Sequence, residues 1–391
     1  MNSFLLRIKR FCGFLFGIVF FFSGLFKLMD PVGAGLVVKE YFDFMHIGFM
    51  APAAKFIGVT LALFETILGA ALACGVWRKP AGLTALIVQS LFTVITLFLL
   101  IFNPEMDCGC FGEVLELTHL ETFIKNIILL ALILAYYFPH QHLGEPEKKK
   151  YVSFVIISVS CVAFMIHSLL YIPIVDFTAY ESGAELLAAR SDGGDEIYEA
   201  VFTYEKDGET EEFTLDALPD STWTFVSTDT RLKEEFEDSI IELSIFDPRT
   251  QTYADTLAAK GKVMVVSLYD TDIEEEAWDK ISDIVCAAAA CGIRPLILAT
   301  ETGTVPQALQ AFAYTCDYKT LISLNRSNAG VTYFHDGTLI KKWSRRSAPD
   351  SEEVREIASG DPTETAIDYE SKGSLGFQGF LLYVSAVLLL L

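Results

Sequence analysis

Six long apolar runs limit what this chain can fold into. They cover residues 11–29, 52–76, 81–102, 120–138, 151–175 and 375–391. A helix of about 20 apolar residues crosses the hydrocarbon core of a bilayer, and in that core only helices or closed barrels satisfy their backbone groups. With 52% hydrophobic and 20% charged residues, the whole composition agrees. We therefore predict an α-helical polytopic membrane bundle, in which the shortest run, 375–391, is the weakest candidate span.

Basic residues predict the orientation of these spans, because short cytoplasmic loops are enriched in Lys and Arg. They cluster at Arg7–Arg10, at Arg78 with Lys79, and at Lys148–Lys150, and these clusters alternate with the runs. The N-terminus is then cytoplasmic. The segments left outside the cell membrane are residues 30–51, 103–119 and 176–374. No small-residue cleavage pattern follows the first run, so we expect it to be retained as a helix.

The outer segment carries the negative charge of the chain. The net charge is −22. Residues 1–175 hold 12 basic and 11 acidic side chains, so the excess of acidic residues lies after residue 175. Such a surface argues against nucleic-acid binding, and we interpret it as keeping a large extracytoplasmic region soluble.

The pattern of the outer segment predicts an α/β domain. Residues 176–260 contain short alternating stretches and turn formers, which are typical of β structure. After 261, a buried strand, a long helix and a second buried strand form a βαβ pattern, which implies parallel strands. A second helix is expected near 304–315. A hairpin then turns at His335, Asp336 and Gly337, and residues 351–374 read as an acidic linker.

Two stretches of this domain resemble thioredoxin. VMVVSLYDTDIEEEAW is similar to the strand that enters the thioredoxin active-site turn, and AGVTYFHDGTLIKKW is similar to its closing hairpin. Residues 261–350 are therefore expected to be thioredoxin-like. However, acidic residues around Asp272–Glu275 stand where the family has Cys-x-x-Cys, and Ala329 stands where it has a cis-proline. Without a dithiol the turn cannot exchange thiols, which favours a binding or scaffolding role.

Three cysteines lie elsewhere in this domain: Cys286, Cys291 and Cys316. In an oxidising compartment an odd number leaves at least one thiol without an intradomain partner. The sequence does not choose among the pairings.

The most specific short motif is MDCGCFGE, residues 106–113, between the third and fourth runs. Two residues of extended chain span roughly 7 Å, whereas a disulfide needs Cα atoms about 4.4 to 6.8 Å apart. A bond between Cys108 and Cys110 thus requires a tight turn at Gly109, which glycine permits. Strained, exposed disulfides have the oxidising potentials associated with exchange. Farther along, Thr118 and Glu121 fit a capping box that begins the fourth helix.

Three interpretations of the motif stay open. The cysteines could be a redox-active dithiol, a structural staple of the loop, or ligands of a metal together with Asp107 or His119. The metal interpretation lacks a second pair of ligands at the usual spacing.

Glu65 lies near the middle of the second run, where a charge is costly and usually faces the interior of the bundle. Counting about 1.5 Å per residue places it within one helical turn of Gln89. We expect either a packing contact between a protonated Glu65 and Gln89, or proton uptake coupled to a thiol or quinone reaction. Quinone is accordingly the candidate cofactor.

The segments FFFSGLFKLMDP, LFETILGAALACG and CGCFG together resemble the DoxX family, and CGCFG resembles its methylamine-utilisation branch, MauE. The likeness covers about residues 10–140. It implies a four-helix bundle in a bacterial inner membrane, here residues 1–140, and a role in disulfide maturation of a separate periplasmic thiol protein. A basic cytoplasmic loop, 141–150, and a fifth helix, 151–175, follow. The alternative is a non-enzymatic membrane scaffold with a structural CGC staple.

The first prediction concerns topology. A reporter that is active only in the periplasm should be active when fused after Gly109 or Asp220, and inactive after Lys149, because the basic loops stay in the cytoplasm. Activity is read in intact cells, with expression checked by immunoblotting. A cytoplasmic result at Asp220 would overturn the orientation and the redox interpretation that depends on it.

Overall fold

The structure is a computed structural model with two compact units. The helical unit comprises residues 1–175 and 371–391, and the sheet unit comprises residues 176–370. The structure describes residues 3–104, 106, 109, 112, 117–138, 143, 146–190, 198–206, 209–220, 222–232 and 240–390. Along the chain, the helical unit therefore comes both before and after the sheet unit.

Five helices of the described residues are long and apolar enough to cross a membrane. They are α1 (Ser3–Met29), α3 (Ala54–Cys74), α4 (Arg78–Phe102), α5 (His119–Tyr137) and α6 (Lys148–Leu170). They coincide with the first five expected spans, which are thereby confirmed as helices. The sixth expected span falls within α13 (Pro362–Leu390), which is helical but is not one of these five.

The connection between the first two spans is itself helical. Asp30 caps α2 (Pro31–Phe44), because its carboxylate accepts hydrogen bonds from the backbone nitrogens of Val32 and Gly33 at 3.2 and 2.9 Å. Pro31 at the first position of the helix fits this role, since its missing N–H would have had no partner there. A 3-10 helix, Gly48–Ala53, then leads into α3.

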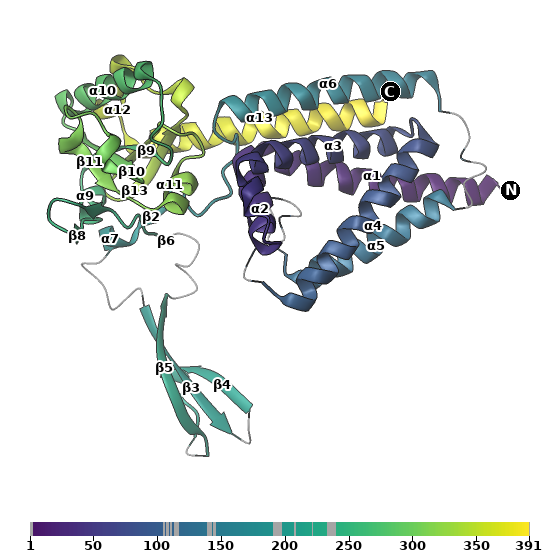
Figure 1. The fold of residues 1–391 in the computed structure, drawn as a ribbon, viewed down its shortest axis with the longest axis horizontal. Coiled ribbons are helices and arrows are strands. Elements are labelled where there is room, and N and C mark those ends of the chain that lie inside the picture. Colours follow the sequence, from purple (N-terminus) through teal and green to yellow (C-terminus); the bar gives the residue numbers. More distant parts are fainter. Residues whose placement is uncertain are drawn as a thin grey trace. The chain divides into compact units, whose positions relative to one another are not determined.

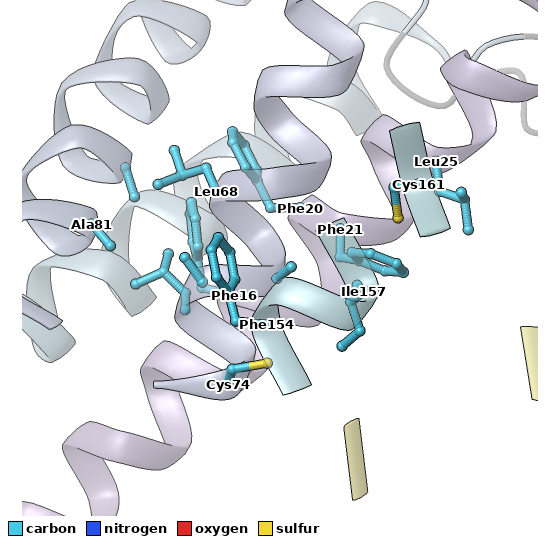
Figure 2. Packing of buried hydrophobic residues seen from close by; sticks show 14 of the residues in the cluster. Phe16, Phe20, Phe21, Leu25, Leu68, Cys74, Ala81, Phe154, Ile157 and Cys161 are labelled. Atoms are coloured by element: carbon cyan, nitrogen blue, oxygen red, sulfur yellow. The ribbon is translucent and has the colours of Figure 1, made fainter. Parts of the chain in front are cut away.

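Small residues bring α1 and α3 together. A Cβ added at Gly24 would lie 2.6 Å from the Ala62 carbonyl oxygen and 2.6 Å from the Thr66 nitrogen, so the two backbones are in close contact there. Close approach at small residues is a usual means of packing helices in membranes. Figure 2 shows the buried side chains of this core, with Phe16 and Phe21 among them.

The other helices of this unit form two further pairs. In Figure 1, α4 and α5 run side by side, and a Cβ added at Gly82 would lie 2.8 Å from the ring of Tyr136. The helices α6 and α13 also pack together, because the rings of Phe164 and Phe380 stack with centroids 4.7 Å apart. In addition, Ser160 donates a 3.4 Å hydrogen bond to Tyr383.

Contacts between loops define the two ends of the bundle. At one end the guanidinium of Arg78, the first residue of α4, donates a 2.8 Å hydrogen bond to the carbonyl of Leu143, which precedes α6. At the other end Gly109 lies against Val37 of α2, and a Cβ added at Gly112 would lie 3.9 Å from the Lys27 Cα. The loops that follow α3 and α5 therefore share one end, and the connections that follow α1 and α4 share the other.

The sheet unit is built on a nine-stranded mixed sheet in the order β6-β2-β13-β12-β9-β10-β11-β7-β8. Its centre pairs β9 (Lys262–Leu268) in parallel with β10 (Arg294–Ala299), and α10 (Glu275–Ala290) connects them. The antiparallel hairpin of β12 (Gly330–His335) and β13 (Thr338–Trp343) continues the sheet. The expected βαβ unit and hairpin are thus confirmed.

Shorter elements complete this unit. The remaining strands of the sheet are β2 (Glu185–Leu186), β6 (Ile240–Ile241), β7 (Phe246–Asp247), β8 (Thr252–Tyr253) and β11 (Ala313–Thr315). The helices are α7 (Leu187–Arg190), α9 (Thr256–Ala259), α11 (Tyr318–Leu324) and α12 (Ser351–Ser359). Single 3-10 turns cover Leu215–Ala217 and Arg345–Ser347. Four of the five short strands come from residues 176–260, so this β-rich segment contributes to the same sheet.

The helix expected near 304–315 is wrong. That segment contains 3-10 turns at Thr302–Thr304 and Gln310–Phe312, followed by β11, which pairs in parallel with β10. Pro306 lacks a backbone N–H in the middle of the segment. The last residues of the segment pair with strand β10 instead of continuing a helix. The helix comes later, at α11.

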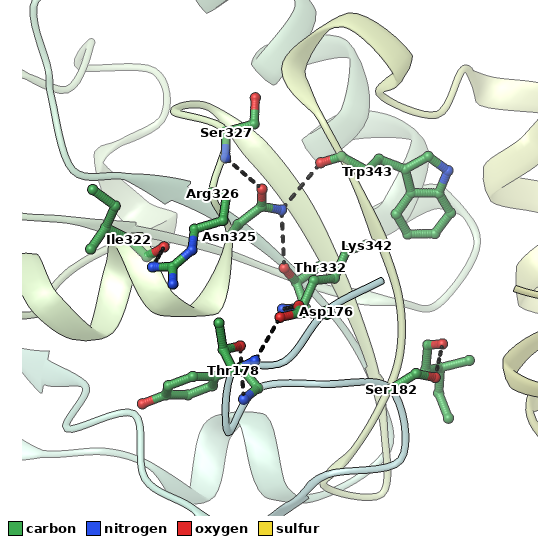
Figure 3. Close-up of polar contacts among 12 residues, drawn as sticks. Asp176, Thr178, Ser182, Ile322, Asn325, Arg326, Ser327, Thr332, Lys342 and Trp343 are labelled. Carbon is green, nitrogen blue, oxygen red and sulfur yellow. Dashed lines mark hydrogen bonds and ion pairs between the residues drawn. The ribbon is translucent and has the colours of Figure 1, made fainter. Parts of the chain in front are cut away.

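Polar side chains hold the ends of the central strands (Figure 3). The Asn325 amide, just after α11, donates hydrogen bonds to the Trp343 carbonyl at 3.1 Å and to the Thr332 hydroxyl at 3.4 Å. It also donates a 3.1 Å hydrogen bond to the Val331 carbonyl. Lys342 of β13 forms a 2.6 Å ion pair with Asp176, the first residue of the sheet unit. This pair ties the start of the unit to its sheet.

A separate three-stranded antiparallel sheet, in the order β4-β3-β5, belongs to the same unit. It consists of β3 (Tyr198–Lys206), β4 (Glu209–Thr214) and β5 (Thr224–Leu232). Edge-to-face rings pack on it: Tyr204 contacts Phe213 and Phe225, and Phe213 contacts Trp223, with centroids 5.3 to 5.8 Å apart. Such aromatic pairs stabilise small sheets.

The second prediction tests the contact between α1 and α3. Gly24→Val should destabilise the protein by about 1–3 kcal/mol, because the new methyl groups meet backbone atoms that cannot move aside. Gly379→Val is the matched control, since no heavy atom lies within 4 Å of a Cβ added there. The thermal midpoint in detergent, followed by size-exclusion chromatography, measures the effect. Equal midpoints for the two variants would contradict the close approach.

Candidate functional site

A buried ion pair joins α1 to α3. The Lys27 ammonium lies 2.7 and 2.9 Å from the two carboxylate oxygens of Glu65. Ser23, one turn earlier on α1, donates a 3.2 Å hydrogen bond to the same carboxylate. The Glu65 side chain is 3% exposed and that of Lys27 is 16% exposed. Both charges are therefore held inside the bundle by hydrogen-bonded partners, as buried charges require.

The expected contact between Glu65 and Gln89 is wrong. Counting depth along the helices ignored which helices pack together. Because α1 lies against α3 at Gly24, the next turn of α1 brings Lys27 to Glu65. Lys27 is thus part of the first helix and a partner of Glu65, although its position at the end of an apolar run suggested only a boundary.

Gln89 faces α5 instead. Its amide donates hydrogen bonds to the backbone and side-chain oxygens of Asn126 at 3.1 and 3.3 Å. The Asn126 amide in turn donates a 3.1 Å hydrogen bond to Thr96 of α4. These contacts connect α4 to α5, and they form a second buried polar group beside the ion pair.

A cavity of about 230 Å³ adjoins the ion pair. Lys27, Glu65, Thr96 and Asn126 contribute polar groups to its wall. The rest of the wall is mainly apolar and includes Val37, Val38, Ile57, Leu61, Phe92 and Ile95. A mostly apolar cavity with a few convergent polar groups is the usual form of a small-molecule site, so this is the candidate functional site.

Two glycines of the MDCGCFGE motif also line the cavity, namely Gly109 and Gly112. Both have positive φ values, +58° and +63°, a left-handed conformation that side-chain-bearing residues rarely adopt. Cys108 and Cys110 lie outside the described residues, as does Asp107. In the chain, however, Gly109 is bonded to both cysteines, and its own place in the cavity wall is described.

The start of α5 follows the expected pattern. The Thr118 hydroxyl accepts a 3.3 Å hydrogen bond from the Glu121 nitrogen, and the Glu121 carboxylate accepts a 3.0 Å bond from the Thr118 nitrogen. The expected capping box is confirmed. His119, considered above as a metal ligand, places Nε2 3.0 Å from the carbonyl oxygen of Pro104.

The three cysteines of the sheet unit are free thiols. Cys286 is exposed and Cys291 is half-buried. Cys316 is buried and its Sγ donates a 3.0 Å hydrogen bond to the Leu243 carbonyl. Burial raises the pKa of the Cys316 thiol to about 12, so at neutral pH this residue is a thiol and not a nucleophilic thiolate.

A family model described as methylamine utilisation protein MauE matches residues 4–139. Residues 4–139 form a MauE family domain. This MauE domain contains the ion pair, the cavity and the MDCGCFGE motif, and its apolar helices belong to a multi-pass membrane protein in a lipid bilayer.

A second model, a domain of unknown function (DUF8463), matches residues 198–235. The match coincides with the three-stranded sheet of β3, β4 and β5. No curated protein and no solved structure matches the chain.

Lys27 and Ser23 were missed as site residues. One signal was present in the sequence: a lysine three residues before Asp30, at the end of one apolar run, can neutralise a glutamate inside the next run. A buried acid in a membrane helix calls for such a partner, and Lys27 is a basic residue of a neighbouring span.

The third prediction concerns the ion pair. Lys27→Met should lower the free energy of unfolding by about 3–5 kcal/mol, because it leaves the Glu65 charge without its partner. Lys27→Met combined with Glu65→Met should recover part of that loss. Lys79→Met, at an exposed position, is the control and should change stability by less than about 0.5 kcal/mol. Thermal midpoints of the natural protein, Lys27→Met, Glu65→Met and the double variant give the coupling, and additive losses would show that the pair does not interact.

Proposed function

We propose that this protein is a membrane thiol-disulfide maturation factor that acts on a separate periplasmic thiol protein. In this proposal Cys108 and Cys110 are the exchanging pair. The observation that carries it is that Gly109, bonded to both cysteines, lines a polar-ended cavity of the MauE domain. A staple that only closed a loop would not need to adjoin a cavity with a buried ion pair.

The orientation belongs to the same proposal. The loops that follow α3 and α5 share one end of the bundle, and both carry basic residues, Arg78 with Lys79 and Lys148–Lys150. We assign this end to the cytoplasm of a bacterial inner membrane. The opposite end, with Gly109 and Gly112, then faces the periplasm, where dithiols are oxidised. The sheet unit is assigned to the same compartment.

We further assign the sheet unit as a thioredoxin-like domain without a dithiol. The support is its central order, in which a βαβ pair, β9 and β10, is followed by the hairpin of β12 and β13 and then by helix α12. At the turn after β9, Asp270 accepts a 3.0 Å hydrogen bond from the Asp272 nitrogen, and the chain has no cysteine there. The unit then serves to hold the partner protein rather than to exchange electrons with it.

Exchange between the loop and a partner proceeds through a mixed disulfide. The thiolate of one protein attacks the disulfide of the other, one S–S bond breaks as another forms, and the second cysteine of the attacking pair resolves the complex. Within the MauE domain, Glu65 holds the Lys27 ammonium in place, so its role in this proposal is positioning. It lies on the cavity wall on which Gly109 also lies.

The fourth prediction tests exchange directly. Exchange is reversible, so the remaining thiolate of Cys108→Ser or Cys110→Ser can attack the disulfide of an already oxidised partner. In cells quenched with acid, one of these variants should trap a reducible adduct heavier than the monomer, because the second cysteine that would resolve it is missing. The double variant should give none. Cys161→Ser, which removes a buried cysteine of α6, is the matched control and should behave as the natural protein. Non-reducing gels and mass spectrometry identify the partner. If neither single variant forms an adduct and the natural pair stays oxidised under reductant, the protein is a scaffold with a structural staple.

A further inference from the structure

The cavity of the MauE domain has the size and polarity for the head of a bilayer-soluble molecule. Its volume of about 230 Å³ exceeds the roughly 150 Å³ cavity that holds benzene, so a headgroup of one or two rings fits. The apolar side chains of the wall come from three helices, α2 to α4, while α1 contributes Lys27 and α5 contributes Asn126. A ligand that reaches such a site is soluble in the hydrocarbon around it.

The ion pair gives the site one defined donor. An ammonium has three N–H donors, and in the described part of the chain Lys27 donates hydrogen bonds to the two carboxylate oxygens of Glu65. The cavity is lined by Lys27, so its remaining N–H is available to an acceptor atom of a ligand. The ring of Phe92, whose centroid is 6.0 Å from Nζ, forms the adjacent wall. An aromatic wall beside a cationic donor suits a flat ring that carries a carbonyl oxygen.

We propose that this cavity binds the headgroup of a membrane quinone, with one quinone carbonyl accepting a hydrogen bond from Lys27. An acyl chain would fill the apolar part but would leave the donor without an acceptor, which is costly inside a bundle. A quinone carries both the apolar ring and the carbonyl. Asn126 and Thr96 lie on the same wall and offer polar contacts to the rest of the head.

The consequence for the reaction rests on the proposed function. After Cys108 and Cys110 have taken two electrons from a partner, they are a dithiol and must be reoxidised. Two S–H bonds break and one S–S bond forms. The two electrons and two protons pass to the quinone, whose two carbonyl oxygens become the hydroxyls of the quinol. Gly109, which is bonded to both cysteines in the chain, lies on the cavity wall.

Binding is tested with the full chain in phosphatidylcholine nanodiscs. Decylubiquinone and menadione are titrated separately by calorimetry, with empty nanodiscs subtracted. We expect saturable binding of at least one of them at one site per chain. Ile95→Phe fills the cavity from α4 and should weaken binding about tenfold. Ile87→Phe is the matched control, because Ile87 lies on the same helix but is 62% exposed and does not line the cavity.

The donor is tested by combining Lys27→Met with Glu65→Met, which removes both charges together. Binding should again weaken about tenfold, the factor expected for one lost hydrogen bond. Absence of saturable binding of either quinone, or equal affinities of the Ile95→Phe and Ile87→Phe proteins, would overturn the proposal. Copurified phospholipid that quinone does not displace would also overturn it, since the cavity would then hold an acyl chain.

The cysteines separate this inference from the proposed function. The protein with Cys108→Ser and Cys110→Ser should bind quinone as the natural protein does, yet fail to convert it to quinol. The reduced natural protein should convert one quinone per chain, measured by the loss of quinone absorbance. Binding without any conversion by the natural protein would leave the quinone site in place and reject the thiol chemistry.

Discussion

The ion pair between Lys27 and Glu65 is the contact on which the arrangement of the helical unit depends. Each charge would be expensive alone among apolar helices, and each is acceptable only because the other lies within 2.7 Å. Residues of a helix are separated by about 100° of rotation, so sliding α1 by one residue would turn Lys27 away from Glu65. The pair thus selects one register of α1 against α3. The close contact at Gly24 brings the two helices near enough for the ion pair to form.

Once α1 and α3 are joined, the remaining helices pack in a way that leaves the cavity. Two polar residues of α4, Gln89 and Thr96, form hydrogen bonds with Asn126 of α5. Residues of α1, α3, α4 and α5 line the cavity, together with residues of α2 and the glycines Gly109 and Gly112. The apolar walls of the cavity therefore result from the way the helices pack in pairs, whereas its polar end results from the charge of Glu65 in α3.

The sequence predicts elements well wherever one residue pattern dominates a segment. Five apolar spans, the capping box of Thr118 and Glu121, and the pairing of β9 with β10 all agree with the structure. These features depend on hydrophobic length, local hydrogen bonds or strand periodicity, each of which is readable from neighbouring residues. The helix α2 was also readable in principle, because Asp30 followed by proline is a strong start signal.

The features that the sequence did not predict depend on which helices and strands pack together. The partner of Glu65 required knowing that α1 packs on α3 at the level of Glu65. Residues 304–315 have helical composition in part, yet β10 offered a strand partner to Ala313–Thr315, and such long-range pairing overrides local preference. Residues from five helices and a loop line the cavity, so no single segment of the sequence predicts it. The cysteines of the MDCGCFGE motif, by contrast, are readily noticed in the sequence but lie outside the described residues.

The course of the chain has a further consequence. Residues 176–370 leave the helical unit after α6 and return to it at α13, and these two helices pack along each other through Phe164 and Phe380. The sheet unit is therefore an insertion into a helical hairpin, and its two ends need span only the short gap between neighbouring helices. Domains with adjacent termini can be added to a host without unfolding it. Its gain or loss could then be a single genetic event that leaves the helices of the MauE domain, all earlier in the chain, unchanged.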